Sequence, residues 1–552
     1  NSSQVYKGVS LNNFLYKGPD CYMNNQLGIL LRWREDHVAV VGDICKMYNS
    51  VYLETMEQHC HRFLWTNLKF GSEPEIYVMT RVNMGDRPAG SISTEALYKT
   101  ADMFQHDNPS AAELLKHGSY IDDLLGSAAS REEAEELTGG AENMLLKGGF
   151  QIKFWYISGD QLEGDAKLTE VLGVCWIPES DRLTFNTSLN FSPKKHGVHI
   201  LPDLEPSEIP ESIPEVLTKR MVLSQMMRVY DPLGLLCAFT LQGKILLRQT
   251  WEKEIGWDEQ LPPELKEKWM KFLCSIYEVR KLQYPRSTKP KDALGVPSLI
   301  LLSDASEKAY GVVAYARWEC RDGSYKCRFI LAKNKIAPLT KRTTPQLELN
   351  GAVLSKRARV VIEKEMRQEF RSVIHLTDSE TVLAMLHKTS TRFKLYEGIR
   401  VGEIQSATEG DVSCWAWVAG VSNTSDWLTR GKDPGEISED SEWFSGPAFL
   451  RLPEEEWGLK FNPITEDPLP GEKNIVTTNA SVCEPPIVDY LKFNSYRKLE
   501  NTLARILNMA SQARLKAVKD QLTTTLLEKA EKIILKDVQT SIQEECKKVK
   551  DG

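Results

Sequence analysis

The chain has 552 residues, of which 41% are hydrophobic and 26% charged, with a formal net charge of −7. This composition is ordinary for a soluble protein, and the length predicts several domains of roughly 100–200 residues each. No run reaches the roughly 18 apolar residues of a membrane span, and the net acidity disfavours nucleic-acid binding over the whole surface.

The eleven cysteines form no Cys-x-x-Cys pair and are expected to be reduced thiols of an intracellular protein. The first ten residues, NSSQVYKGVS, hold neither an initiating Met nor an apolar signal core, which favours an internal piece of a longer reading frame. Proline-rich breaks near 202–214 and 285–297 and a loose zone over 433–487 divide the chain. The predicted blocks are 1–200, 201–296, 297–432, 433–487 and 488–552.

The block 1–200 mixes short strands with helical patterns. Residues 38–41 read as a buried strand that ends at Gly42 and Asp43. Residues 96–104 and 131–147 are helical in pattern, and the second helix has an acidic first turn that suits the helix dipole. Between them, short strands at 119–121 and 124–125 flank Asp122 and Asp123.

Asp43, Asp122 and Asp123 are the first candidate site. Carboxylates at strand ends and hairpin tips can converge across a sheet, and Mg²⁺ is a hard ion that prefers oxygen ligands. Two such ions can bind the attacking and leaving oxygens of a phosphoryl transfer. The Asp-Asp pair by itself favours a plain polar turn between two strands, so the surrounding motifs must decide whether it is a metal site.

The block 201–296 is mainly helical in pattern, and the block 297–432 alternates strands with helices, beginning with a strand over 298–303. Four acidic residues follow strands or begin helices there: Asp304, Glu348, Asp378 and Asp426. Four carboxylates can hold two Mg²⁺ ions, one to activate water and one to stabilise the leaving 3′-oxygen. Helix capping, as by Asp378 and Ser379, is the alternative for any single member.

Basic residues gather in the same block. Residues 317–359 contain eleven Lys and Arg but three acidic residues, a local net charge of +8. Such a face beside a nuclease site would follow nucleic-acid phosphates, and its binding would weaken with salt. A solvated helix face is the alternative interpretation.

The motifs around the first site resemble those of reverse transcriptases. Residues 120–123, Tyr-Ile-Asp-Asp, are similar to the Tyr-x-Asp-Asp box, and VAVVGDICKMYNSVYL is similar to the first catalytic strand. NMGDRPAGSISTEALYKTAD resembles the template- and nucleotide-facing segment, GGFQIKFWYISGD the next palm motif, and VLGVCWIPESDRLTF the primer-gripping hairpin. The resemblance implies nucleotide- or template-binding roles for Tyr48, which would exclude a ribose 2′-OH, and for Gly85, Arg87, Tyr120 and Lys153.

A palm domain over 1–200 is therefore implied, with Asp43, Asp122 and Asp123 binding Mg²⁺, or Mn²⁺ in its place, for DNA synthesis from dNTPs. Only 42 residues precede Asp43, so we expect most of the fingers to be missing and the polymerase half to be impaired. The second acidic set resembles ribonuclease H, in the order Asp-Glu-Asp-Asp at spacings of 44, 30 and 48 residues. That resemblance implies a metal site that cuts the RNA strand of an RNA–DNA hybrid.

GDRPAGSIS, RFLW, YDPLGLL (230–236) and WEKEIGWDEQLP (251–262) resemble the polyproteins of Bel/Pao-type LTR retrotransposons. This group implies a helical thumb or connection over 201–296, a linker over 433–487, and a helical segment over 488–552 before an integrase zinc-binding domain. Part of the stretch resembles a family labelled as a Pao retrotransposon peptidase. We disfavour a peptidase because the chain has no Asp-Thr-Gly or Asp-Ser-Gly motif.

We therefore expect an α+β and α/β multidomain fragment of a retrotransposon polyprotein with reverse transcriptase and ribonuclease H activities. The implied partners are RNA and DNA template–primers, RNA–DNA hybrids, dNTPs and the rest of the polyprotein, namely integrase and upstream gag and protease, but no membrane. The implied location is the cytoplasm, in virus-like particles, or the nucleus. The alternative is a catalytically inactive or co-opted nucleic-acid-binding relic.

Overall fold

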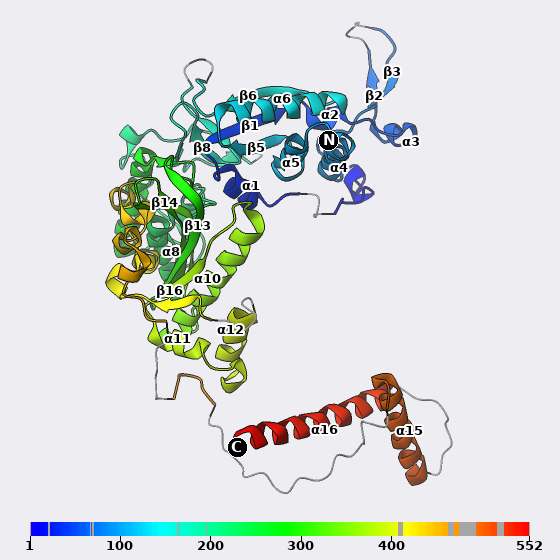
Figure 1. The fold of residues 1–552 in the computed structure, drawn as a ribbon. Coiled ribbons are helices and arrows are strands. Elements are labelled where there is room, and N and C mark those ends of the chain that lie inside the picture. The colour runs from blue at the N-terminus through cyan, green and yellow to red at the C-terminus, as the bar shows by residue number, and fades with distance from the viewer. Residues whose placement is uncertain are drawn as a thin grey trace. The chain divides into compact units, whose positions relative to one another are not determined.

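The structure is a computed structural model that describes residues 2–19, 23–66, 68, 71–162, 164, 166–195, 197–406, 412–461, 468–473, 493–515 and 524–550. The chain divides into two compact units, residues 1–473 and residues 474–552. Helices and several separate sheets give the α+β and α/β multidomain fold that the sequence predicts (Figure 1). No helix in the described part of the chain is both long and apolar enough to cross a membrane.

Residues 1–200, which we expect to form a palm and call the palm part, contain a four-stranded antiparallel sheet in the order β4-β5-β1-β6. Its strands are β1 (Val38–Ile44), β4 (Ser119–Tyr120), β5 (Asp123–Ala128) and β6 (Ile152–Ile157). Helices α4 (Ala89–Phe104), α5 (Pro109–His117) and α6 (Arg131–Lys147) bury apolar side chains against it, among them Leu97, Leu115 and Leu145, which cluster with Leu124 of β5. The predicted strand at 38–41, the hairpin around the two aspartates and the helix at 131–147 are confirmed.

Smaller elements precede and interrupt this sheet. They are η1 (Leu11–Asn13), α1 (Gln26–Trp33), α2 (Met47–Ser50), α3 (Thr55–Gln58), η3 (His59–His61), β2 (Arg62–Trp65) and β3 (Glu75–Val78). β2 and β3 form a separate two-stranded ribbon that extends away from the palm sheet (Figure 1).

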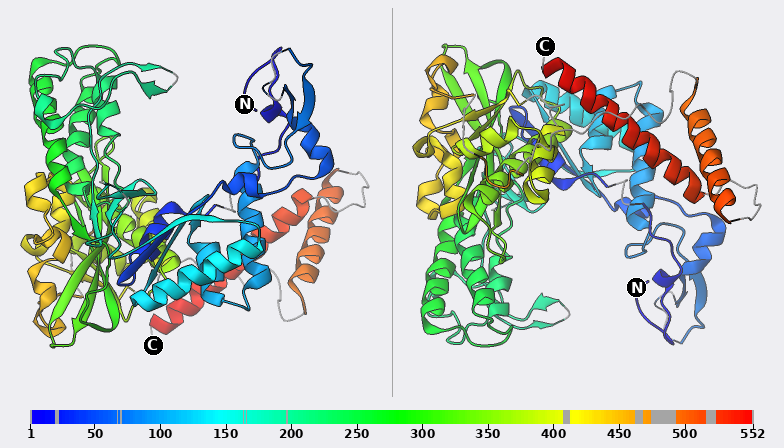
Figure 2. Two further views of the ribbon diagram at one scale, coloured as in Figure 1. Left: turned by 90° about the horizontal axis from the view of Figure 1, so that it is seen from above. Right: turned by 90° about the horizontal axis from the view of Figure 1, so that it is seen from below.

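A second four-stranded sheet, in the order β12-β9-β8-β7, links the palm part to the connection, residues 201–296. It consists of β7 (Thr169–Val171), β8 (Val174–Ile177), β9 (Arg182–Thr184) and β12 (Tyr284–Pro285). The connection itself is mainly helical, as predicted, with η4 (Pro206–Glu208), α7 (Lys219–Met226), α8 (Cys237–Glu252), α9 (Pro263–Ser275) and η5 (Ile276–Lys281). Figure 2 shows the short ribbon of β10 (Lys194–Lys195) and β11 (Val198–His199), in blue-green, projecting from this helical part.

The nuclease-like part, residues 297–432, is built on a mixed five-stranded sheet in the order β15-β14-β13-β16-β17. The strands are β13 (Ala293–Ala305), β14 (Ala309–Cys320), β15 (Tyr325–Ile336), β16 (Val373–Thr377) and β17 (Trp415–Trp417). β13, β14 and β15 pair antiparallel, whereas β16 is parallel to β13 and β17 is parallel to β16. Its helices are α10 (Thr344–Glu365), α11 (Glu380–Leu386), η6 (Ser390–Arg392), α12 (Leu395–Ser406), η7 (Gly420–Ser422), η8 (Thr424–Asp426) and α13 (Trp427–Arg430).

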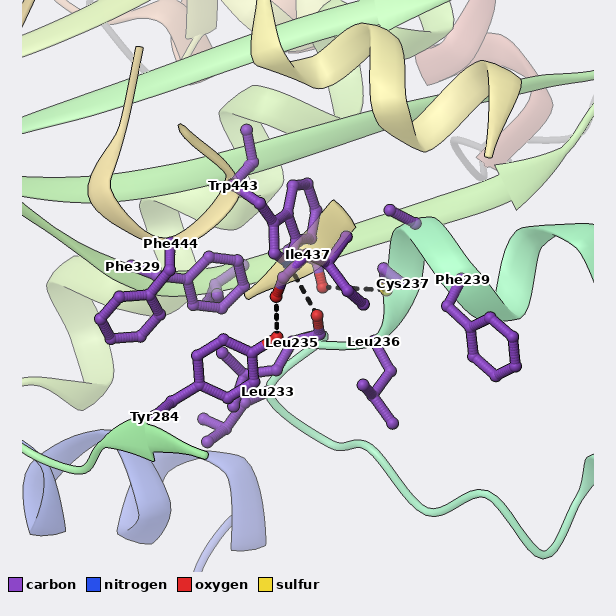
Figure 3. Packing of buried hydrophobic residues seen from close by; sticks show 14 of the residues in the cluster. Leu233, Leu235, Leu236, Cys237, Phe239, Tyr284, Phe329, Ile437, Trp443 and Phe444 are labelled. Carbon is purple, nitrogen blue, oxygen red and sulfur yellow. Dashed lines mark hydrogen bonds between the residues drawn. The ribbon is translucent and has the colours of Figure 1, made fainter. Parts of the chain in front are cut away.

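One hydrophobic core joins the connection, strand β15 and the segment after residue 433 (Figure 3). Trp443 and Phe444 are 0% and 1% exposed. Trp443 Nε1 donates to the Leu235 carbonyl at 2.7 Å, and the Tyr284 hydroxyl donates to the Ile437 carbonyl. The short helices here are η9 (Pro434–Ile437), α14 (Glu442–Ser445), η10 (Ala448–Arg451) and η11 (Glu454–Glu456).

This packing differs from the linker expected over 433–487. Residues 434–457 are rich in Pro and Glu, yet a few large aromatic side chains anchor them in the core. The later positions 462–467 and 474–487 of that expected linker lie outside the described residues. The remaining domain boundaries stay predictions.

The second unit contains two helices, α15 (Tyr496–Leu515) and α16 (Thr524–Lys550). They pack against each other through apolar side chains: Leu499, Leu503, Ala504, Ala530 and Ile534. The predicted amphipathic helix around 527–538 is therefore confirmed, with its apolar stripe facing α15.

Candidate active sites

The palm sheet brings the first three predicted carboxylates together. Asp43 and Asp123 are directly opposite each other in the β1–β5 ladder, and Asp122 lies in the turn that joins β4 to β5. Residues opposite each other in an antiparallel pair have Cβ atoms about 4.5–5.5 Å apart. The Ile44 N–H donates to the Asp122 carbonyl at 2.8 Å, which fixes the turn against the end of β1.

The turn itself has an unusual backbone. Ile121 has φ of +54°, in the left-handed region that a β-branched residue rarely adopts. Conformations of this kind persist only where the surrounding structure holds them, and they concentrate at functional sites. The strained residue directly precedes Asp122, so the strain is located at the acidic cluster.

The three carboxylates repel one another. Burial, together with the charges of Asp122 and Asp43, raises the pKa of Asp123 to about 6. Burial likewise raises the pKa of Asp43, which nearby Lys153 lowers and Asp122 raises. A bound divalent cation would relieve this repulsion, and a donor set made only of carboxylates fits a hard ion such as Mg²⁺.

The other predicted palm residues divide into two groups. Tyr48 is half-buried, and burial and the Asp122 charge together raise its pKa. Tyr120 pairs with Asp123 across the hairpin, so both tyrosines border the cluster, as does Lys153. Gly85 and Arg87 are exposed in the loop before α4, and the backbone hydrogen bonds of both, at 2.9 Å, go to the Asn12 side chain and not to the cluster.

The nuclease-like sheet gathers the second set of four carboxylates at one end. Asp304 is on β13, and Asp378 directly follows β16, its parallel neighbour. Glu348 lies near the start of α10 and accepts a hydrogen bond from Ser379 Oγ at 2.6 Å. Asp426 ends η8, which contacts β13. All four residues predicted from spacing therefore converge.

Their electrostatics couple them into one group. Burial, together with the charges of Asp378 and Asp426, raises the pKa of Asp304 to about 7. Burial also raises the pKa of Glu348 and of Asp378, with added repulsion from Asp378 on the first and from Asp426 on the second. As in the palm, this is the environment that a divalent cation stabilises.

Several supporting residues were not predicted from the sequence. Thr429 Oγ1 donates to Asp304 Oδ2 at 2.6 Å, and this hydrogen bond lowers the pKa of Asp304. Arg430 Nε lies 2.5 Å from Asp426 Oδ1, and Trp417 Nε1 donates to the Asp378 carbonyl at 3.0 Å. The motif NTSDWLTRG holds Thr429 and Arg430 within four residues of Asp426, so adjacency was the available signal.

Two glycines allow the site to close tightly. A Cβ at Gly351 on α10 would lie 3.1 Å from the Asp304 carbonyl oxygen, and one at Gly420 would lie 3.1 Å from Asp378 Oδ2. Beside Asp378 and Asp426 is an open cavity of about 300 Å³, also lined by Asn423, Trp427 and Arg430. Asp378 and Asp426 of the acidic set therefore line an open cavity.

Within the described residues, the one group with three ligand atoms mutually within 4.8 Å is Asp292, Cys320 and Asp322, at the opposite end of β13. Lys326 Nζ already bonds Asp292 Oδ2 at 2.6 Å, so this group has its own compensating cation. The oxygens of the two predicted sites are more widely spaced. Their fit to a metal rests on their all-carboxylate chemistry and on the raised pKa values of Asp43, Asp123, Asp304, Glu348 and Asp378.

The predicted basic face over 317–359 is divided in the structure. Arg317 is buried and donates to the Leu450 and Leu452 carbonyls, and Arg359 pairs with Glu363 at 3.0 Å. The exposed basic side chains are fewer, among them Lys333, Lys335 and Lys341. The local charge of +8 is therefore only partly a surface charge.

Residues 218–379 match the family model of the Pao retrotransposon-like RNaseH-like domain. The matched segment includes Asp304, Glu348 and Asp378, and the family description names an RNaseH-like domain. This segment supports the interpretation of the chain as a fragment of a Bel/Pao-type retroelement polyprotein. No curated protein matches the chain.

Solved structures of a foamy viral protease-reverse transcriptase are also similar to the chain. One, in complex with an RNA/DNA hybrid, is 12% identical with a TM-score of 0.43, over 72% of this chain and 45% of that chain. Another, a dRH form with ds DNA, is 14% identical with a TM-score of 0.45, over 73% of this chain and 60% of that chain. The chain thus spans about half of the length of these two proteins.

Proposed function

We propose that the chain is the reverse transcriptase and ribonuclease H portion of a Bel/Pao-type retrotransposon polyprotein, and that its nuclease-like part cuts RNA in RNA–DNA hybrids. One observation carries this proposal: Asp304, Glu348, Asp378 and Asp426 converge at one end of a mixed sheet, and the first three lie in the segment with an RNaseH-like family match. Two Mg²⁺ ions, or Mn²⁺ in their place, are the proposed cofactors.

Bound ions would supply Lewis-acid activation of the water and of the scissile phosphate. The protein's own contribution is to hold each oxygen in place. Ser379 orients Glu348, Thr429 orients Asp304, and Arg430 holds Asp426. The cavity beside Asp378 would admit the phosphate of the strand to be cut.

For the palm part, we propose DNA synthesis from dNTPs on RNA or DNA template–primers at Asp43, Asp122 and Asp123. The facing positions of Asp43 and Asp123 in the ladder support this site. Tyr48, Tyr120 and Lys153 would contact the nucleotide or template from beside the cluster, and Gly85 and Arg87 from the loop before α4. The proposed location is cytoplasmic virus-like particles or the nucleus, together with the remaining polyprotein.

The test of the nuclease is cleavage of an end-labelled RNA in an RNA–DNA duplex with Mg²⁺. Asp378→Asn should reduce the rate at least about 100-fold, because it removes a charged ligand. Asp258→Asn is the matched control, since Asp258 is exposed and pairs with Arg220 in the connection. If Asp378→Asn cuts as fast as the parent, the nuclease assignment is wrong.

The palm assignment has a separate test, extension of a primed template with dNTPs. Activity that survives an Asp122→Ala, Asp123→Ala double substitution would refute that site. The alternative function, an inactive nucleic-acid-binding relic, predicts salt-dependent binding of the hybrid with no turnover in either Mg²⁺ or Mn²⁺.

A further inference from the structure

Helix α1 and the residues after it extend from the palm part into the nuclease-like part (Figure 1). Arg32 donates through one nitrogen to the Glu365 carbonyl at 2.7 Å and pairs with the Glu365 carboxylate at 3.1 Å. Through its other terminal nitrogen it donates to the His117 carbonyl at 2.7 Å. Glu365 is the last residue of α10, so a palm side chain satisfies the end of that helix.

Glu35 anchors the same end of α10 from a buried position. Its side chain is 5% exposed and accepts from the Arg367 N–H at 2.6 Å and the Gln368 N–H at 3.2 Å. The Arg367 guanidinium adds an ion pair at 3.0 Å. A buried carboxylate is costly unless it is paired and hydrogen-bonded, so each of these contacts matters to the folded state.

Arg34 contacts a different part of the nuclease-like sheet. It is 0% exposed and donates to the carbonyls of Phe329 and Ile330, both at 2.7 Å, and of Arg286 at 2.9 Å. The β14–β15 ladder shifts register here, which leaves Ile330 as the extra residue of a β-bulge. The guanidinium fork therefore satisfies two carbonyls at an irregular point of the sheet edge.

A second buried arginine secures the backbone of this segment. Arg286 is 0% exposed, donates to the carbonyls of Trp33 and Asp36, and pairs with Asp181 at 2.8 Å. The Thr288 N–H donates to the Arg34 carbonyl at 2.7 Å. The segment that leads into β13 thus donates hydrogen bonds to the carbonyls of Trp33, Arg34 and Asp36.

We propose that residues 32–36, the α1 lock, join the palm part and the nuclease-like part into one rigid body and fix the separation of their acidic sites. The lock lies directly before β1, which carries Asp43. It also holds the far end of α10, whose other end carries Glu348. One regular element therefore connects the lock to each acidic set: β1 leads to the palm set and α10 to the nuclease-like set.

The first test needs no catalytic activity. Native-state hydrogen exchange is measured for the whole chain, for Glu35→Gln and for Arg34→Met. In Glu35→Gln, we expect the amides at 366–368 to exchange roughly 10- to 100-fold faster than in the parent, because hydrogen bonds to a charged group are lost. In Arg34→Met, we expect the same increase for the amides next to 329–330. Arg220→Gln is the matched control, since it breaks an exposed bidentate pair with Asp258.

Unchanged exchange in Glu35→Gln and in Arg34→Met would overturn the lock. If Arg34→Met does not fold, Arg367→Gln replaces it, because Arg367 is half-exposed and its removal leaves no cavity. Arg367→Gln combined with Glu35→Gln should then speed exchange no more than Glu35→Gln alone, because Glu35 also holds the backbone N–H groups of Arg367 and Gln368. Additive effects would show that the two residues act apart and would overturn the pair.

The second test rests on the proposed function and measures where the RNA is cut. On a hybrid with a recessed DNA primer, the parent chain should give one dominant distance between the primer 3′ end and the cut. Glu35→Gln should broaden that distribution, and Arg220→Gln should not. A variant that cuts at the parent's single distance would refute the lock, whereas a parent that cuts nothing would refute the proposed function and leave the exchange result to decide the lock.

Discussion

Replacing Thr429 by Val should shift the pH dependence of RNA cleavage toward higher pH. Thr429 is 1% exposed, and its hydroxyl lies 2.6 Å from Asp304 Oδ2. Valine has nearly the same shape but cannot donate, so the substitution removes the hydrogen bond without opening a cavity. Since that bond lowers the pKa of Asp304, its loss must raise the pKa further.

The size of the shift follows from the strength of the bond. A hydrogen bond to a charged group contributes about 1.5–3 kcal/mol, and about 1.36 kcal/mol corresponds to one pKa unit. Burial and neighbouring charges place the pKa of Asp304 at about 7, so roughly half of the metal-free protein is ionised there at pH 7. A rise of about one unit would leave about a tenth ionised and reduce the rate roughly fivefold at that pH.

The assay is hybrid cleavage at fixed Mg²⁺ between pH 6 and pH 9.5, for the parent, Thr429→Val and Thr429→Ser. The valine variant should recover the parent rate at high pH, whereas the serine variant keeps the hydroxyl and should follow the parent throughout. Superimposable profiles for the parent and Thr429→Val would refute the reasoning. A loss of rate that is equal at every pH would show a structural defect instead.

Three further predictions follow from the buried acids and the shared core. The folded-state pKa of Asp304 is raised from 3.8 to about 7, so the folded protein loses stability as pH rises through this window. Without metal, Asp304→Asn should therefore have a higher Tm than the parent at pH 8 but not at pH 4. Equal Tm values for the two proteins at pH 8 would contradict this. Mg²⁺ at tenfold its Kd should stabilise the parent by about 1.4 kcal/mol, measured as a rise in Tm. The Asp378→Asn variant should largely lack this rise. An equal rise in the parent and in Asp378→Asn would show that the ion binds outside the Asp378 site. Trp443→Ala should cost about 3–5 kcal/mol in the free energy of unfolding by urea, whereas Trp65→Ala, at a 41% exposed position, should cost much less; similar costs would disprove the role of Trp443 in the core.

Local patterns placed two of the predicted acidic residues at strand ends. Asp43 and Asp304 each follow an apolar strand, and strand ends are visible in hydrophobic periodicity. Whether four such residues meet depends on strand order, which no local pattern contains. The family resemblance supplied that order, and the mixed sheet β15-β14-β13-β16-β17 brings Asp304 and Asp378 to one end.

Other features depend on contacts that sequence patterns do not encode. The helices over 434–457 are a single turn each, too short for a helical period, so their Pro and Glu content suggested a linker. Arg34 and Glu35 read as ordinary charges after a helix, although both are buried by segments about 300 residues away. Adjacency to Asp426 was the one signal for Thr429, and it was weak because a hydroxyl three residues from an acid can point in many directions.

The core shown in Figure 3 sets the smallest recombinant fragment worth expressing. The family match ends at residue 379, before Asp426 and before the buried Trp443. A fragment cut at 218 and 379 would expose Leu235, Tyr284 and Phe329 to water and should aggregate. A fragment that ends after residue 457 would keep these side chains covered. A fragment that also begins before residue 26 would include residues 32–36, which bind the end of α10.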